Sequence, residues 1–137
     1  MFYEYKKENT IHIPAPFKRN ITPLFMKDDD IISNANFSVH LTEWEPGCEI
    51  DEHFHSDGME AMYLISGNGL AIIDGNKYTF KPDSMLVAPP GISHKIVNTG
   101  KELLRVLCIF SPPVTGQSLK SRAIEAVNLS KNNKPSY

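Results

Sequence analysis

A short segment of the chain, DEHFHSDGME at residues 51–60, carries side chains that could bind a metal ion. His53 and His55 are separated by one residue, so on a β-strand both imidazoles would point to the same side. Neutral imidazole is the commonest metal ligand, and Glu60 could add a carboxylate from the next strand. His94, which follows a Pro-Pro-Gly turn, is the candidate fourth ligand from a distant strand. Because a lone H-x-H pair is more often a surface or core feature, the surrounding elements must decide between the two interpretations.

The middle of the chain consists of short β-like stretches separated by turns. Phe37, Val39 and Leu41 alternate with polar residues, which is typical of a half-buried strand. Further strands are predicted over residues 61–66, 70–73, 77–80, 85–88, 94–97 and 103–110. Short strands with turn signals between them indicate a sandwich or barrel, so the predicted fold class is all-β.

The two ends of the chain differ from this middle part. Residues 1–35 contain three prolines that exclude a long helix, and we expect an irregular segment that packs on the barrel, with one or two edge strands at most. The barrel itself is predicted over residues 36–113. In residues 114–137, Leu119 and Ala123 lie on one face of a predicted short helix, which a polar tail follows.

Composition restricts the class of protein. A chain of 137 residues with 41% hydrophobic and 22% charged residues is typical of one globular domain. The net charge of −2 gives no basic surplus for nucleic acid, so we expect no nucleic-acid partner. The sequence contains neither a signal-peptide pattern nor an apolar run that could cross a membrane, and we expect a cytoplasmic protein with no membrane partner. Cys48 and Cys108 are not spaced like a zinc ribbon or a redox pair.

Two of the predicted strands are apolar on both faces. The segments MYLI (residues 62–65) and LLRVLCIF (residues 103–110) lack the alternation of a half-buried strand, so both faces should be covered. One face would meet the core, and the other would meet the N-terminal segment or a second copy of the chain. We therefore expect a homodimer.

The wider pattern resembles the cupin family. Its first motif is Gly, five residues, His-x-His, three or four residues, Glu, six residues, Gly, and residues 47–67 match every fixed position. Its second motif is Gly, five residues, Pro-x-Gly, two residues, His, three residues, Asn, and residues 89–98 match the part after the first Gly. Asp83 replaces that leading glycine; Asp tolerates a left-handed turn conformation, so the turn should be retained.

The resemblance implies a fold, a metal site and a range of activities. It implies a double-stranded β-helix barrel with one divalent transition metal per chain, bound by His53, His55, Glu60 and His94. The ligands suit Fe, Mn, Ni, Zn or Cu, and affinity order does not choose among them. The chain would be a metal-dependent enzyme of dioxygenase, isomerase or lyase type that acts on a polar organic metabolite such as a sugar acid or a dicarbonyl compound. The alternative is a non-enzymatic cupin that binds or senses a small molecule.

Six further side chains are candidates for the small-molecule pocket: Met62, Leu64, Ile96, Asn98, Arg105 and His40. The first four share the predicted inward faces of Glu60 and His94, although plain core packing is the competing interpretation. Arg105 could hold a substrate carboxylate by two hydrogen bonds, or it could be a surface residue with a packed stem. His40 could support the metal ligands or serve only as part of the strand.

The end of the last predicted strand has a resemblance of its own. Residues 109–116, IFSPPVTG, resemble the end of ectoine synthase, a small cupin lyase whose metal site lacks the H-x-H pair. We interpret this segment as the generic exit from the last strand of a cupin.

Overall fold

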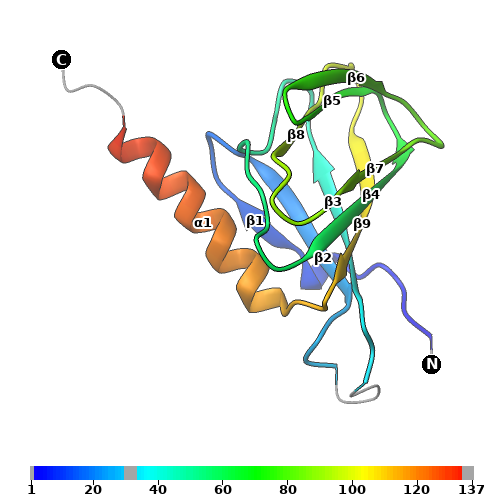
Figure 1. Ribbon diagram of the computed structural model, residues 1–137. Helices are drawn as coiled ribbons and strands as arrows, with labels where there is room; N and C mark the ends of the chain where they lie inside the picture. The colour runs from blue at the N-terminus through cyan, green and yellow to red at the C-terminus, as the bar shows by residue number, and fades with distance from the viewer. Residues whose placement is uncertain (1, 30–33, 134–137) are drawn as a thin grey trace.

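The computed structural model describes residues 2–29 and 34–133. Within these ranges the chain forms a single-turn helix, nine strands and one long helix (Figure 1). Their bounds are η1 (Lys7–Asn9), β1 (Ile11–Ile13), β2 (Arg19–Phe25), β3 (Ser38–Trp44), β4 (Met59–Ser66), β5 (Gly69–Ile73), β6 (Asn76–Phe80), β7 (Met85–Ala88), β8 (His94–Val97), β9 (Leu104–Ser111) and α1 (Gly116–Asn132). The all-β prediction is confirmed, with α1 as the one long helix of the described residues.

The strands form two antiparallel sheets that enclose the interior of the barrel (Figure 1). The larger sheet has the order β1-β2-β3-β9-β4-β7, and the smaller sheet has the order β6-β5-β8. Most predicted strands lie within two residues of the observed ones, and β7 and β8 coincide with them. The hairpin between β5 and β6 turns at Asp74 and Gly75, whose φ angles of 49° and 77° fit the tight turn that Asp-Gly favours.

The N-terminal segment contains more regular structure than its prolines suggest. Strand β2 pairs with β3 from Asn20 to Phe25 and is covered at the sheet edge by β1. The register shifts between Pro23 and Phe25. Proline has no N–H to donate, and a bulge is one of the few places where a sheet accepts it. Strands β1 and β2 thus extend the larger sheet at one edge, where we expected one or two strands.

Helix α1 is longer than the predicted short helix. The hydroxyl of Thr115 accepts a hydrogen bond from the backbone N–H of Ser118 at 3.0 Å and caps its start. The helix then continues to Asn132, so residues 128–132 are helical although we expected them in a frayed tail. Residues 134–137 of that predicted tail lie outside the described residues.

Apolar side chains form two separate clusters. The first, which we call the barrel core, lies between the two sheets: Trp44, Ile50, Met62, Leu64, Ala71, Phe80, Leu86, Ala88, Ile96, Leu104, Val106 and Cys108. The second, which we call the helix-side core, lies between α1 and the N-terminal strands: Ile13, Ile21, Met26, Phe110, Leu119, Ala123 and Val127. Phe110, at the end of β9, belongs to the second cluster although its strand runs along the first.

The outer face of the larger sheet is not covered by the described N-terminal segment. Met59 and Ile65 of β4 are 44% and 42% exposed, and Met85 and Val87 of β7 are 54% and 43% exposed. We considered the N-terminal segment and a second copy of the chain as covers of this face. Cover by a second copy, in a homodimer, stays a prediction. No helix of the described residues is long and apolar enough to cross a membrane.

Candidate metal centre

Backbone pairing joins the two histidine segments, which are far apart in the sequence. His53 and His94 form an antiparallel bridge, in which each backbone N–H donates to the other residue's carbonyl oxygen at 3.1 Å and 2.8 Å. The N–H of Gly91 donates to the carbonyl oxygen of His55 at 2.8 Å. Residues that face each other in such a bridge carry their side chains on the same side. The imidazoles of His53 and His55 are therefore positioned through this bridge, outside a regular strand.

Glu60 comes from the larger sheet. It is the second residue of β4, where the inward positions are Glu60, Met62 and Leu64, as the alternation predicted. Its neighbours across the sheet are Ala88 on β7 and Phe110 on β9. Its side chain thus points from the larger sheet toward the histidines.

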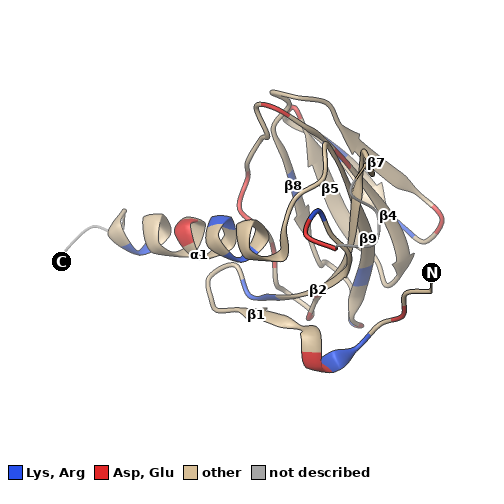
Figure 2. Cartoon of the chain, turned by 90° about the horizontal axis from the view of Figure 1, so that it is seen from below, with Lys and Arg blue, Asp and Glu red and all other residues tan. Residues whose placement is uncertain are grey.

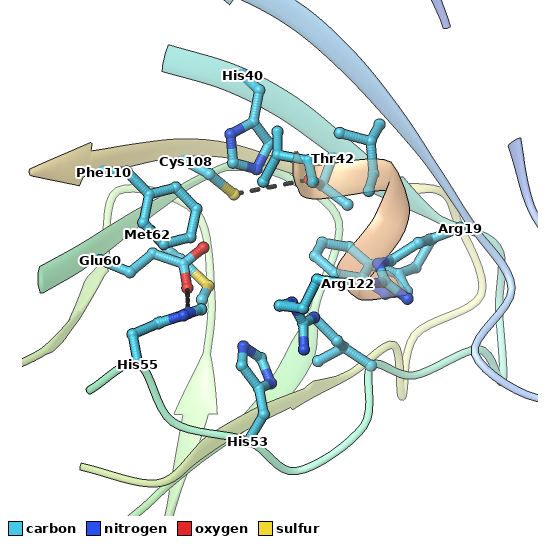
Figure 3. A pocket seen from close by; sticks show the side chains of 14 residues that line it. Arg19, His40, Thr42, His53, His55, Glu60, Met62, Cys108, Phe110 and Arg122 are labelled. Carbon is cyan, nitrogen blue, oxygen red and sulfur yellow. Dashed lines mark hydrogen bonds and ion pairs between the residues drawn. The ribbon is translucent and has the colours of Figure 1, made fainter. Parts of the chain in front are cut away.

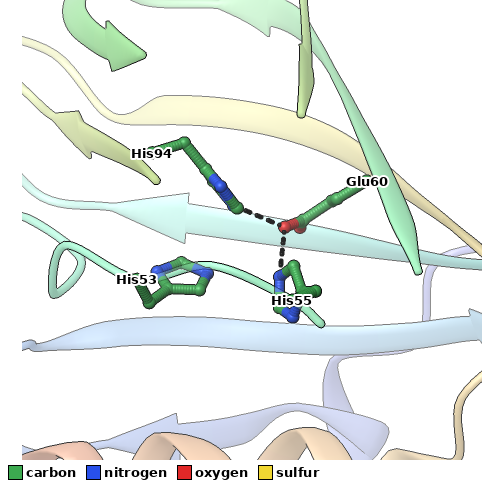
Figure 4. Close-up of side chains that lie close together, drawn as sticks. All are labelled: His53, His55, Glu60 and His94. Atoms are coloured by element: carbon green, nitrogen blue, oxygen red, sulfur yellow. Dashed lines mark hydrogen bonds and ion pairs between the residues drawn. The ribbon is translucent and has the colours of Figure 1, made fainter. Parts of the chain in front are cut away.

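The four predicted ligands converge at one point (Figure 4). One ligand atom from each of His53, His55, Glu60 and His94 lies within 4.8 Å of the others. The Nε2 atoms of His55 and His94 both lie 3.0 Å from the same carboxylate oxygen, Oε2 of Glu60. The side chain of His94 is fully buried, and that of Glu60 is almost so.

The hydrogen bonds on the far sides of two rings determine which nitrogen faces the interior. Nδ1 of His53 lies 2.8 Å from the carbonyl oxygen of Asp51, and Nδ1 of His94 lies 3.1 Å from that of Ile92. A carbonyl oxygen only accepts, so both Nδ1 atoms carry the hydrogen, and the Nε2 atoms of the neutral rings have free lone pairs. Metal-bound histidines have this arrangement.

This arrangement fits a cation at the centre of the cluster. A neutral His94 presents a lone pair to an ionised carboxylate oxygen 3.0 Å away, and two acceptors at that distance repel each other. A proton or a metal ion between them removes the repulsion. Three imidazoles and one carboxylate are a ligand set that suits divalent transition metals.

Charge and burial keep the ligands in metal-binding protonation states. Burial disfavours the ionised form of Glu60, but a hydrogen bond from the ring of His55 holds the pKa of its carboxyl well below the usual range. Burial, together with the positive charge of Arg122, lowers the pKa of His53 to about 3. At neutral pH Glu60 is therefore ionised and His53 is neutral, as metal coordination requires.

A small cavity of about 30 Å³ lies against the cluster (Figure 3). Its walls combine ligands, apolar residues and charged groups: Arg19, Ile21, His40, Thr42, Trp44, Ile50, His53, His55, Glu60, Met62, Cys108, Phe110, Leu119 and Arg122. They come from both the barrel core and the helix-side core. The cavity therefore lies at the boundary between the two clusters, and the first half of α1 closes it.

Comparison with known proteins gives the family. The cupin domain family matches residues 40–110, which is more than half of the chain. The chain belongs to the cupin family. The crystal structure of a predicted oxalate decarboxylase from Thermotoga maritima has the same fold, with a TM-score of 0.73 and 20% identity over 82% of this chain and 99% of that one. The double-stranded β-helix prediction is thus confirmed.

The relatives of this cupin include ectoine synthases. The L-ectoine synthase of Saccharophagus degradans is 31% identical over 98 residues, which cover 70% of this chain and 69% of that protein. The enzyme of Bordetella petrii is 38% identical over 85 residues, which cover 61% of this chain and 62% of that protein. The likeness to these enzymes is thus wider than the IFSPPVTG ending on which we first noted it.

Two of the six pocket candidates line the cavity of this cupin, namely Met62 and His40. The ring of His40 stacks on Phe110, with the ring centroids 5.7 Å apart. Burial lowers the pKa of His40 to about 4, so the ring is neutral. Cys108 lies beside it, and burial raises the pKa of its thiol, so the thiol stays protonated and is a poor ligand.

The other four candidates lie elsewhere. Leu64 and Ile96 are buried in the barrel core, away from the cavity walls. The side chain of Asn98 binds the carbonyl oxygens of Trp44 and Glu102 and has a structural role.

Arg105 was the candidate for binding a substrate carboxylate, and the structure places it outside the barrel. Its Nε donates to Glu43 at 2.9 Å, on the outer face of the sheet. The reason is the alternation of β9, whose inward positions are Leu104, Val106 and Cys108.

Sequence reasoning missed the charged residues that line the cavity. Arg19 lies on β2 and Arg122 on α1, both outside the residues that match the cupin family. Asp51 is partly buried, and its carboxylate lies 3.3 Å from the guanidinium of Arg122. One signal was available: Leu119 and Arg122 are three residues apart, so a helix carries them on the same face. No local pattern distinguishes Arg19 from a surface arginine.

Proposed function

We propose that this cupin is a metal-dependent enzyme of lyase or isomerase type that acts on a small polar metabolite, with one divalent transition metal held by His53, His55, Glu60 and His94. The observation that carries the proposal is the convergence of three imidazoles and one carboxylate, with two ring nitrogens on one carboxylate oxygen. The relatives named L-ectoine synthase support a reaction other than oxidation. Sugar acids and dicarbonyl compounds are the substrates we favour, since both offer oxygen atoms that can chelate an ion.

The protein's contribution would be to hold the ligands and exclude water. When bound, a divalent ion would polarise a carbonyl group or stabilise an enolate. The backbone carbonyls of Asp51 and Ile92 keep the rings of His53 and His94 in the required orientation. Four protein ligands would leave open positions for a chelating substrate on an ion that prefers six.

His40 is the side chain we assign to proton transfer. Its ring lines the cavity, is neutral at physiological pH, and has an Nδ1 with no hydrogen-bond partner in the described structure. It could accept a proton from a carbon next to a polarised carbonyl group and return it elsewhere. The thiol of Cys108 is protonated and cannot serve as the base.

A second function is favoured by the small size of the cavity. A volume of about 30 Å³ holds on the order of one or two waters, so a substrate requires α1 or a neighbouring side chain to move. A cupin that binds or senses a small molecule without converting it would tolerate a cavity that stays this small until the ligand enters. Binding without product formation would identify this alternative.

Elemental analysis tests the metal site directly. We expect about one transition-metal ion per chain in protein purified without chelators, and loss of that ion in His94→Ala and in the less buried His55→Ala. His12→Ala is the matched control, because His12 is exposed and remote from the cluster. Retention of wild-type metal content in both cluster variants would show that the ligand assignment is wrong.

The identity of the ion then directs the search for a substrate. Manganese, nickel or zinc would favour lyase or isomerase chemistry, whereas iron would favour a dioxygenase and a screen under air. Protein that contains no metal and takes up none on titration would exclude the catalytic proposal.

A further inference from the structure

Two arginines reach the cavity from segments that the cupin family match does not include. Arg19 comes from β2 and Arg122 from α1, and both line the cavity that contains Glu60 and His53 (Figure 3). In Figure 3 they lie across the cavity from Glu60 and Phe110. Figure 2 shows basic residues near the start of β2 and in the first half of α1.

Arg19 is a buried cation with few partners. It is 3% exposed, and its Nη1 donates to the carbonyl oxygen of Phe17 at 2.9 Å. No other hydrogen bond of its side chain, and no carboxylate within 4.0 Å, occurs among residues 2–29 and 34–133. Burial lowers the pKa of the guanidinium to about 10, so it is still charged at neutral pH. A guanidinium has five N–H donors, and leaving a buried charge without a partner is strongly unfavourable.

A donor without a partner belongs to another residue that lines the same cavity. Trp44 is 1% exposed, lines the cavity, and its indole Nε1–H has no hydrogen-bond partner in the described structure. Buried polar groups are nearly always hydrogen-bonded, so a buried guanidinium with one acceptor beside an indole N–H with none is uncommon. An acceptor supplied by a ligand would satisfy both.

Arg122 lies between the cavity and the solvent, in the wall that α1 forms. Its guanidinium makes one contact with Asp51, at 3.3 Å, and its side chain is 32% exposed. It also lines an outer hollow of about 220 Å³, together with His55, Phe110 and Leu119, which are walls of the inner cavity as well. Movement of Arg122 and Leu119 would therefore join the two spaces and enlarge the small cavity.

The local charges favour an anion once an ion is bound. Counted by formal charge, Arg19 and Arg122 balance two carboxylates, that of Glu60 in the cavity wall and that of Asp51 beside Arg122. A divalent ion in the histidine cluster would then leave the cavity with a positive excess. A neutral ligand would leave that excess uncompensated, whereas a carboxylate would neutralise part of it.

We propose that Arg19 and Trp44, with Arg122 at the entrance, form a carboxylate-binding subsite, so that the ligand of this cupin is a small carboxylic acid with a second oxygen group that reaches the ion. Arg19 would bind the carboxylate with charge-assisted hydrogen bonds, and the indole N–H would add a third. The inference rests on the proposed function, because the ion is the other anchor of the ligand.

Malonate is a suitable probe, with malonamide as the neutral control of similar size. Trp44 is the only tryptophan of the sequence, so its fluorescence reports binding, and calorimetry gives the Kd for every variant. We expect malonate to bind the metal-loaded protein at least about tenfold more tightly than malonamide does. Arg19→Met should weaken malonate binding about 10- to 100-fold, and Trp44→Phe about 3- to 10-fold. Arg105→Met, an arginine outside the cavity, should leave the Kd unchanged.

The same titrations on chelator-treated protein separate this inference from the proposed function. If the protein never binds metal, the proposed function fails, but a weaker malonate affinity that still depends on Arg19 would support the subsite. Equal binding of malonate and malonamide, no binding of malonate to either form, or an unchanged Kd in Arg19→Met would each overturn it. If Arg19→Met does not fold, Trp44→Phe and Arg122→Met decide, and unchanged affinity in both would count against the subsite.

Discussion

The barrel core and the helix-side core of this cupin differ in how they are built. The barrel core comes from strands β3 to β9 and the loop before β4, and many of its side chains are fully buried. The helix-side core joins β1 and β2 to the end of β9 and to α1, segments from both ends of the chain. The candidate metal ligands belong to the first region, whereas the groups that close the cavity belong to the second. The candidate metal site is thus supported by the barrel core, whereas access to its cavity is controlled by the helix-side core.

The largest expected effect is a deletion within the barrel core. Leu64→Ala removes a fully buried side chain between the two sheets and should lower the free energy of unfolding by about 4 kcal/mol. Denaturant unfolding measures this loss. Ile65→Ala is the matched control on the same strand, because Ile65 faces outward, and it should cost less than about 1 kcal/mol. Equal losses in the two variants would contradict the assignment of inward and outward faces.

The next effect concerns His40, which lies where the two cores meet. Its pKa is about 4 in the native protein against an ordinary value of 6.5, so between these pH values the unfolded chain takes up a proton that the native state does not. Native stability should therefore fall as the pH is lowered from 6.5 to 4, by on the order of 3 kcal/mol. Unfolding of metal-free protein across this range, compared with His40→Gln, isolates the contribution. A variant with the same pH dependence as the wild type would show that His40 titrates normally.

The difference between the two cores also explains what the sequence could predict. The strands of the barrel follow from local alternation and turn residues, because each is determined by neighbours close in the chain. The set of four candidate ligands is what the resemblance to the two cupin motifs implied, since His94 lies far from the other three in the sequence. The turn at Asp83 was predicted from local sequence in the same way. Asp83 replaces the leading glycine of the second motif and adopts a φ of 65°, as expected for a left-handed turn.

The cavity walls could not be predicted in this way. Arg19, Trp44 and Arg122 meet only after β2, β3 and α1 have packed together, and nothing local marks any of them as a cavity residue. Arg105 is different, since strict alternation along β9 assigns that position to the outer face. Of the two interpretations that we gave for it, the local pattern already favoured the surface residue with a packed stem.

A deletion in the helix-side core should have a smaller effect than one in the barrel core. Leu119→Ala removes a side chain that is 9% exposed and lies beside the cavity, and we expect a loss of about 2 kcal/mol. Leu129→Ala, on an exposed position of the same helix, should be nearly neutral. If Leu119→Ala costs as much as Leu64→Ala, the two cores are equally tight and the comparison between them fails.

The smallest effect concerns the start of α1. Thr115→Ala removes the hydroxyl that accepts from Ser118 N–H, and loss of such a cap costs about 1 kcal/mol. Because Leu119 and Arg122 lie in the first two turns of this helix, fraying there should open the cavity while the barrel stays intact. Hydrogen exchange should therefore become faster across residues 116–122 and stay unchanged in β4 and β9. Thr115→Ser, which keeps the hydroxyl, should restore the slow exchange. Faster exchange in both the helix and the barrel strands would instead mean that the cap stabilises the whole molecule, and that α1 does not open independently of the barrel.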